Sequence, residues 1–312
     1  RSPSRGLGDV YKRQLFDCTL YYDEDLILEA RLNILSKYFD KFIICEAKYT
    51  HSGEKKKLNF DINKFSEFKN KIVYLTLDNE PKNIIYDSSR SDNFEDPKNW
   101  RSNAVKRIAH QRNSLLKAVD QLADSNDFIF YSDNDEIPNM INFDKFKETA
   151  KIILFEQKLF YYKFNLLCDR IFWYGTRAIK KKNLIDFEWI RQIKPKKYPF
   201  FRIDTLWKNN KYINLKIIRD GGWHFTRIIT PEEIHKKELI AEHHDEYKAS
   251  KKDVNSIKDL IERRVIDHDH LADKTDSKYG KEFKLKLYNL ENLPHYIKNN
   301  INKYQNYLDL DR

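Results

Sequence analysis

The sequence is poor in the residues that build flexible connections. Glycine occurs 7 times and proline 8 times in 312 residues, so we expect no long flexible linker and no low-complexity tract. No apolar run approaches the roughly 20 residues that a membrane-spanning helix needs. Hydrophobic residues make up 40% of the chain, which is enough for a substantial core in one large domain, or in one domain with an appendage.

Cysteine is also scarce. Cys18, Cys45 and Cys168 are odd in number and far apart, and two of them lie in apolar, strand-like runs. We therefore expect buried free thiols in a reducing compartment, and neither disulfides nor a cysteine-based metal cluster.

An excess of basic residues gives the chain a formal net charge of +10. Such a charge is typical of nucleic-acid-binding proteins, but here the lysines are spread along the chain. The first 14 residues, RSPSRGLGDVYKRQ, hold four basic residues and one acidic residue, so +7 remains without them. Because this opening lacks an initiator methionine and differs in composition from the rest of the chain, we expect residues 1–14 to be a non-native leader.

Strand and helix patterns alternate through the first half of the chain. Apolar runs predict strands over residues 15–22, 41–47, 71–77 and 128–131, and apolar spacing predicts helices over residues 24–39 and 101–122. This alternation is typical of an α/β fold with a central, mostly parallel sheet. We expect residues 15–230 to form this domain, with antiparallel strands in its aromatic-rich second half, and residues 231–312 to form a helical C-terminal extension packed on it.

Three carboxylates crowd the end of the fourth predicted strand. In the stretch DFIFYSDNDEIPNM, residues 127–140, an apolar run ends in Asp133, Asn134, Asp135 and Glu136, and Pro138 stops the strand. Asp-x-Asp also occurs at residues 23–25, 267–269 and 309–311, so the spacing alone is not diagnostic. Position is more informative, because open α/β sheets bind ligands beyond the carboxyl ends of their strands. The residues themselves leave open a metal site and a solvated turn.

A cation at this position would suit transfer of a sugar from a nucleotide-sugar. The diphosphate leaves with negative charge, and Mg²⁺ or Mn²⁺ held by one or two carboxylates stabilises that charge. An EF-hand calcium loop fits less well, because its glycine and its terminal glutamate are missing.

Six blocks of the sequence carry a family resemblance. In chain order they are DEDLILEARLNIL (residues 23–35), DKFIICEAKYTHSGEKKKLNF (40–60), HQRNSL (110–115), YSDNDEIP (131–138), GGWHFT (221–226) and HDEY (244–247). Together they resemble glycosyltransferase family 17, which includes the β-1,4-mannosyl-glycoprotein 4-β-N-acetylglucosaminyltransferases. No block beyond about residue 250 takes part.

The resemblance implies a GT-A-like, Rossmann-related fold and a metal-dependent, inverting transfer of a sugar to a glycan acceptor. The implied donor is a UDP-sugar such as UDP-GlcNAc, and the implied cofactor is Mn²⁺ or Mg²⁺ at Asp133 and Asp135. We expect a cytoplasmic enzyme of microbial or viral origin without a transmembrane segment, and we leave peripheral membrane association open. No nucleic-acid partner is expected.

Other residues are candidates on chemical grounds. His224 is a candidate metal ligand, since imidazole suits Mn²⁺ and the preceding glycines let the backbone approach a ligand; packing beside Trp223 is the alternative. Lys56 and Arg112 are candidates for the diphosphate, with surface salt bridges as the alternative. Contacts to uracil or ribose, or a role in forming the turn, are open for Glu46, Thr50, His51 and Gly53.

An inverting transfer needs a general base that takes the proton of the acceptor hydroxyl. Asp220, Glu246 and Glu136 are the candidates, and Glu136 alternatively orients the aspartates or caps the turn. The imidazoles of the second half have no diagnostic metal spacing, and we expect them on solvated helix faces: His243, His244, His268 and His270.

Two other functions remain open at this point. A metal-dependent phosphoesterase or nuclease would use the same carboxylates without a sugar acceptor. A non-catalytic, basic nucleic-acid-binding protein would bind with a steep dependence on salt concentration, which the scattered charge disfavours.

Overall fold

The computed structural model describes residues 13–89, 95–196, 211, 214–271 and 279–310, so residues 1–12 of the expected leader lie outside it. Within these ranges the larger sheet has seven strands in the order β10-β6-β9-β4-β1-β2-β3. Its members are β1 (Leu15–Leu20), β2 (Lys41–Ala47), β3 (Ile72–Leu77), β4 (Phe128–Tyr131), β6 (Ile152–Phe155), β9 (Arg177–Lys180) and β10 (Leu215–Ile218).

The four strands predicted in the first half lie side by side in this sheet as β4-β1-β2-β3 and pair in parallel. β10 is parallel to β6, and β9 runs antiparallel to both of its neighbours. The prediction of a mixed α/β fold with a mostly parallel sheet is confirmed at this level, and none of the described sheets closes into a barrel.

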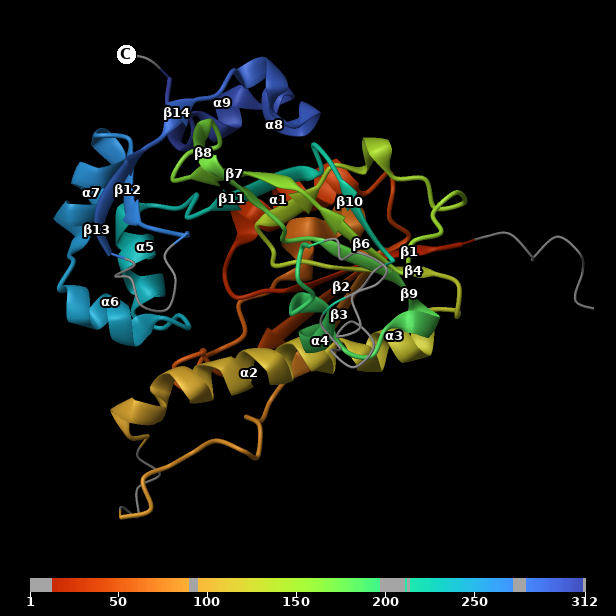
Figure 1. Cartoon of the computed structure of the whole chain (residues 1–312), viewed down its shortest axis with the longest axis horizontal. Helices are drawn as coiled ribbons and strands as arrows, with labels where there is room; N and C mark the ends of the chain where they lie inside the picture. The colour runs from red at the N-terminus through yellow and green to blue at the C-terminus, as the bar shows by residue number, and fades with distance from the viewer. Residues whose placement is uncertain (1–12, 90–94, 197–210, 212–213, 272–278, 311–312) are drawn as a thin grey trace, which may run out of the picture.

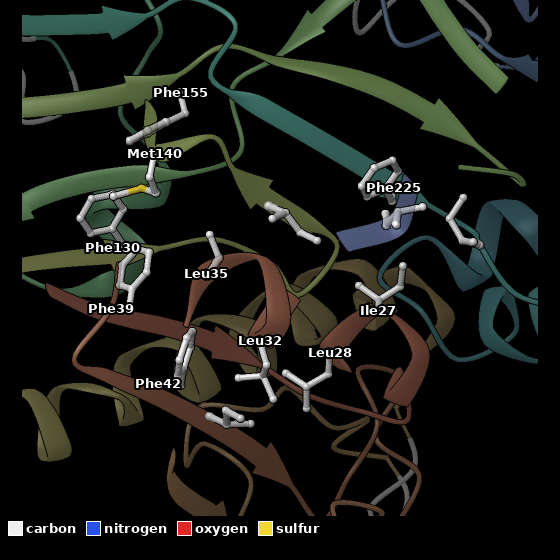
Figure 2. Packing of buried hydrophobic residues seen from close by; sticks show 14 of the residues in the cluster. Ile27, Leu28, Leu32, Leu35, Phe39, Phe42, Phe130, Met140, Phe155 and Phe225 are labelled. Atoms are coloured by element: carbon white, nitrogen blue, oxygen red, sulfur yellow. The ribbon is translucent and has the colours of Figure 1, made fainter. Parts of the chain in front are cut away.

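Apolar clusters cover both faces of the larger sheet. Phe128 and Phe130 of β4 join one cluster, and Ile129 and Tyr131 join the other. The helix α1 (Asp25–Leu35) covers the first face, where its leucines and isoleucine pack among the phenylalanines of the sheet (Figure 2). Burial on both faces explains why these strands are continuously apolar instead of alternating.

Helices cover the second face as well. They are α2 (Trp100–Ser114), α3 (Leu116–Leu122) and α4 (Phe187–Arg191), which lie together below the strands in Figure 1. The sequence predicts one helix over residues 101–122, whereas the structure has a break at Leu115. Ser114 Oγ donates to the carbonyl of Gln111 at 2.7 Å, and a hydroxyl that bonds back to the preceding turn bends a helix.

A smaller, five-stranded sheet stands beside the larger one, with the order β14-β8-β7-β11-β5. The chain passes from the larger sheet into the smaller one three times, from β4 to β5, from β6 to β7 and from β10 to β11. The strands of the smaller sheet are β5 (Glu136–Pro138), β7 (Gln157–Tyr161), β8 (Leu166–Trp173), β11 (Gly222–Thr226) and β14 (Lys286–Leu287).

The C-terminal region is not purely helical. Its helices α5 (Pro231–Glu238), α6 (His244–Ser250) and α7 (Val254–Glu262) are followed by the antiparallel pair β12 (Val265–His268) and β13 (Tyr279–Lys284). β14 then adds a strand to the smaller sheet. The last helices, α8 (His295–Asn299) and α9 (Ile301–Tyr304), contribute Ile297 and Tyr304 to the cluster under α1.

Short 3-10 turns link several of these elements. They lie at Ile62–Phe68, Pro97–Asn99, Met140–Asn142, Lys181–Asn183, Leu290–Asn292 and Gln305–Tyr307. Across the described ranges no helix is both long enough and apolar enough to cross a membrane. Cys18, Cys45 and Cys168 are buried and free, as predicted.

Candidate active site

The acidic turn connects the two sheets. β4 ends at Tyr131 in the larger sheet, and β5 begins at Glu136 in the smaller one. The backbone N–H of Glu136 donates to the carbonyl of Asp133 at 3.0 Å, and that of Phe225 on β11 donates to the carbonyl of Asp135 at 2.9 Å. The turn is therefore anchored at a carboxyl end of the parallel strands, where α/β sheets bind ligands.

A buried arginine holds the backbone of this turn. Arg31 on α1 is 0% exposed, and its Nε and Nη2 donate to the Asp17 carboxylate at 2.7 and 2.6 Å. Its Nη1 donates to the Glu136 carbonyl at 2.9 Å and to the Asp133 and Asn134 carbonyls at 3.3 Å. Nη2 also reaches Ser132 Oγ at 2.7 Å. The guanidinium of Arg31 thus donates to three backbone carbonyl groups of the turn, and buried carbonyl groups need such a hydrogen-bond donor.

A second arginine, which is partly buried, holds the carboxylates. Arg191 at the end of α4 donates to Asp133 Oδ2 at 2.9 Å and to both Glu136 oxygens at 2.8 and 2.9 Å. Tyr131 OH donates to Asp133 Oδ1 at 3.0 Å, and Arg112 lies 3.8 Å away. Burial alone would raise the pKa of Asp133, but Arg191 and Arg112 hold it below its ordinary value. Asp133 is therefore a carboxylate that arginines already neutralise.

Glu136 is fully engaged inside this network. Besides Arg191, it accepts hydrogen bonds from the Asp133 N–H at 2.9 Å and from Trp173 Nε1 at 2.6 Å. Burial raises the pKa of Glu136, but the Arg191 charge, the His224 charge and the Arg191 hydrogen bonds together lower it, and the net shift is downward. A carboxylate with four donors and a depressed pKa is a weak proton acceptor, so the geometry favours the orienting role over that of general base.

Asp135 faces a different partner. Its Oδ2 lies 3.3 Å from His224 Nε2, because β11 pairs with β5 and sets His224 opposite Glu136. Burial lowers the pKa of His224, but the Asp135 carboxylate and its hydrogen bond raise it, with a net upward shift. The Nδ1 atom of His224 is buried without a hydrogen-bond partner in the described structure.

The spacing of Asp135 and His224 fits a divalent cation. Hard cations bind their ligands at about 2.1 Å, so two neighbouring ligands of one ion lie roughly 3 Å apart. The Asp135–His224 separation of 3.3 Å agrees with this spacing. No group of three His, Cys, Asp or Glu side chains that could hold a metal occurs among the described residues. The protein would supply two ligands, and water and substrate phosphates would complete the shell, as is usual for Mg²⁺.

A cavity of about 500 Å³ opens at this turn. Eight of the residues selected from the sequence line it, namely Thr50, His51, Lys56, Arg112, Asp133, Asp135, Glu136 and His224. Burial and the nearby Arg112 charge lower the pKa of His51 to about 4, so this imidazole is neutral at neutral pH. Lys56 pairs with Glu46 and lies 4.9 Å from the centre of the Tyr22 ring.

The other four selected residues lie outside the cavity lining. Glu46 is buried and accepts from Tyr74 OH at 2.8 Å and from the N–H groups of Asn59 and Phe60, so it fixes the loop after β2. Gly53 has φ +93°, and a Cβ there would lie 2.5 Å from the guanidinium of Arg107. Both residues shape the loop that carries Thr50 and His51.

The two remaining candidates for the general base also lie elsewhere. Asp220 is 75% exposed at its side chain and pairs with Lys158 at 2.5 Å. Glu246 on α6 accepts from Arg101 at 2.7 Å. The carboxylates that line the cavity from the C-terminal region are instead Glu238 and Glu242. Nothing in the sequence spacing distinguishes them from the other acidic residues of these helices.

The C-terminal region contributes more to the cavity than the sequence predicts. His243, His268 and His270 line it, and His244 is buried, so the expectation of solvated helix faces is wrong for these imidazoles. The reason is that α5, the residues that lead into α6, and β12 contribute to the wall of the cavity, and that His244 packs against Trp100. Lys237 and Arg227 also line the cavity, paired with Glu24 and Glu238.

The sequence model of glycosyltransferase family 17 matches residues 8–194 of this chain. The match covers more than half of the chain, and it begins inside the segment that we expect to be a leader. The structure shows a mixed α/β fold, and the family match makes the protein a glycosyltransferase. The chain belongs to glycosyltransferase family 17, and the resemblance drawn from its motifs is confirmed. No curated protein matches the chain. His224 and the C-terminal wall of the cavity lie beyond the matched residues.

Proposed function

We propose that this glycosyltransferase is metal-dependent and transfers GlcNAc from UDP-GlcNAc to a glycan acceptor with inversion, on a GT-A-like fold. The observation that carries the proposal is the Asp135–His224 pair, 3.3 Å apart, on the cavity at the carboxyl end of β4. Family membership supports transfer to a glycan. Nothing in the described part of the chain favours a phosphoesterase or a nucleic-acid-binding protein.

Asp135 and His224 are the residues that would hold Mn²⁺ or Mg²⁺. A bound cation would stabilise the negative charge of the departing diphosphate. Asp133 has a supporting role, because Arg191 and Tyr131 occupy its oxygens, and any contact with the ion would pass through water. Glu238 and Glu242 line the cavity, and we propose that one of them is the general base of the inverting transfer.

The nucleotide is assigned to the side of the cavity at the ends of β1 and β2. Tyr22 and His51 line this side, and they offer an aromatic ring and a neutral imidazole to a base. Lys56 and Arg112 supply positive charge to the diphosphate. Their charges are already shared with Glu46 and Glu188, so they would bind phosphate as part of a network.

Calorimetric titration with UDP and UDP-GlcNAc, in Mn²⁺ and in EDTA, tests the proposal. We expect Mn²⁺-dependent binding to the wild type, and its loss in Asp135→Asn and His224→Ala. Asp78→Asn is the control, because Asp78 is an exposed carboxylate paired with Lys48 and does not line the cavity. If the folded wild type binds neither nucleotide, or if binding is unchanged by EDTA, the metal-dependent mechanism is wrong.

A further inference from the structure

The cavity has an aromatic wall on the side of the smaller sheet. Trp173 ends β8, Tyr161 ends β7, and His268 and His270 come from β12 and the residues after it; all four line the cavity. The ring centres of Trp173 and His270 lie 5.8 Å apart, and those of His268 and His270 lie 4.7 Å apart. Both pairs of rings meet edge to face, with interplanar angles of 74° and 71°.

Hydrogen bonds fix this wall. Trp173 Nε1 donates to Glu136 at 2.6 Å, which ties the indole to the acidic turn. Tyr161 OH is hydrogen-bonded to His270 Nε2, and β7 and β8 are neighbours in the sheet. Trp173 is only partly buried, so its ring borders the cavity instead of filling the core. Rings that are held in place before a ligand binds lose little freedom on binding.

A charged pair borders the aromatic wall. Arg227 Nη2 lies 2.7 Å from Glu238 Oε1, both residues line the cavity, and the guanidinium is 5.8 Å from the centre of the Tyr161 ring. Burial and the nearby imidazoles lower the pKa of His270 to about 3, so the ring is neutral at neutral pH. The wall therefore combines aromatic rings, of which His270 is neutral, with one donor group and one acceptor group.

We propose that this wall is the binding subsite for the acceptor sugar, a pyranose whose C–H groups contact the rings of Trp173, His268 and His270 and whose hydroxyls bond to Arg227 and Glu238. Apolar surface with a few placed polar groups is the usual composition of a small-molecule site, and a pyranose presents both kinds of surface. The inference rests on the proposed function, since it assigns the acceptor to the same cavity.

The position of the acidic turn separates this subsite from the donor. Thr50 and His51 follow β2 of the larger sheet, whereas Trp173 belongs to the smaller sheet, and the turn from β4 to β5 joins the two. Lys56 and Arg112 are on the donor side, where a diphosphate needs positive charge. The aromatic wall suits a neutral ring better, so an acceptor on this wall would meet the donor at the turn.

Saturation-transfer NMR in the presence of UDP and Mn²⁺ tests the subsite, with N,N′-diacetylchitobiose, mannotriose and glucose 6-phosphate as probes. We expect at least one neutral oligosaccharide to bind the wild type, and the phosphorylated sugar to bind no better. Trp173→Ala and His270→Ala should weaken that binding roughly tenfold or more, about 1.4 kcal/mol. Trp173→Phe should retain part of it, because a ring face remains.

Phe172→Ala is the matched control. Phe172 precedes Trp173 on β8, is 56% exposed and does not line the cavity, so sugar binding should stay unchanged. UDP binding, measured in parallel, should also persist in His270→Ala and Phe172→Ala, neither of which removes the contact of Trp173 with His224, whose ring centres lie 4.8 Å apart. Trp173→Ala also removes a hydrogen bond to Glu136. His270→Ala tests the aromatic wall without that effect, because His270 is hydrogen-bonded to Tyr161 and not to the turn.

The outcomes separate the two proposals. If UDP binds with Mn²⁺ but no neutral sugar binds, or if sugars bind equally to Trp173→Ala and His270→Ala, the subsite is wrong and the donor assignment stands. If UDP itself fails to bind the folded wild type, the proposed function fails, whatever the sugars do.

Discussion

Arg31 offers the sharpest test of how the acidic turn is held. Its guanidinium meets the Asp17 carboxylate at 2.6 and 2.7 Å, and both side chains are 0% exposed. Arg31→Met keeps the apolar stem but leaves the Asp17 charge buried without a partner. Removing one member of a buried ion pair costs about 3–5 kcal/mol, and we expect a loss of that size in the free energy of unfolding.

The double variant Asp17→Asn with Arg31→Met separates the two roles of Arg31, which are to pair with Asp17 and to hold the backbone of the acidic turn. Replacing Asp17 removes the unpaired charge, so roughly 1–3 kcal/mol should return. The carbonyls of Asp133, Asn134 and Glu136 still lack the Arg31 donor, so the turn should remain loose. Transfer activity and Mn²⁺-dependent UDP binding should therefore stay low even though stability is partly restored.

Urea unfolding and nucleotide binding are measured on the same preparations. Lys258→Met is the control, since Lys258 makes an exposed pair with Glu232 at 2.8 Å, and such pairs contribute little; its unfolding midpoint should not change. A full recovery of UDP binding in the double variant would refute the positioning role of Arg31. If Arg31→Met alone is as stable as the wild type, the inference that it leaves Asp17 as a costly buried charge is refuted.

Two further changes follow from the geometry of the site. Gly222→Ala should lower the free energy of unfolding by about 1–3 kcal/mol, because Gly222 has φ +129° and a Cβ there would lie 2.1 Å from the Ile137 carbonyl oxygen. The same change should weaken Mn²⁺-dependent binding, because Gly222 is two residues from His224. Gly280→Ala, with φ +94° and open space around it, measures the backbone strain alone. His51 has its folded-state pKa lowered to about 4, below an unfolded value of about 6.5, so its neutral form stabilises the fold above about pH 6.5. That stability, up to about 3 kcal/mol, is lost as the pH falls from 6.5 to 4, and the pH dependence of unfolding should be shallower in His51→Gln.

The parts of the fold that the sequence predicts are those with a strong local pattern. β1 to β4 are short apolar runs bounded by polar turns, and the spacing in α1 and α2 is set by contacts within a few turns. β5 and β11 have three and five residues, too few for a period to be visible. The second sheet is therefore missed as a sheet, although the sequence does locate the acidic turn that leads into it.

The two arginines that organise the site show a second limit. Arg31 reaches Glu136 across 105 residues of chain, and Arg191 reaches it across 55. Neither spacing is a motif. Arg31 does lie in the first block of the family resemblance, residues 23–35. Asp17 is a further clue, because it is a charged residue in an otherwise apolar strand and a buried carboxylate needs a partner. No comparable sign marks Arg191, which ends a five-residue helix.

The contrast between Asp133 and Asp135 gives the acidic turn its chemical asymmetry. Arg31 binds the backbone of the turn from one side, and Arg191 binds the carboxylates of Asp133 and Glu136 from another, so both carboxylates already have a guanidinium partner within the protein. Asp135 meets an imidazole instead of a guanidinium, and imidazole can share a cation with a carboxylate whereas guanidinium can only compete with it. The same turn therefore holds two carboxylates for structure and leaves Asp135 with a partner that can join it in binding a metal.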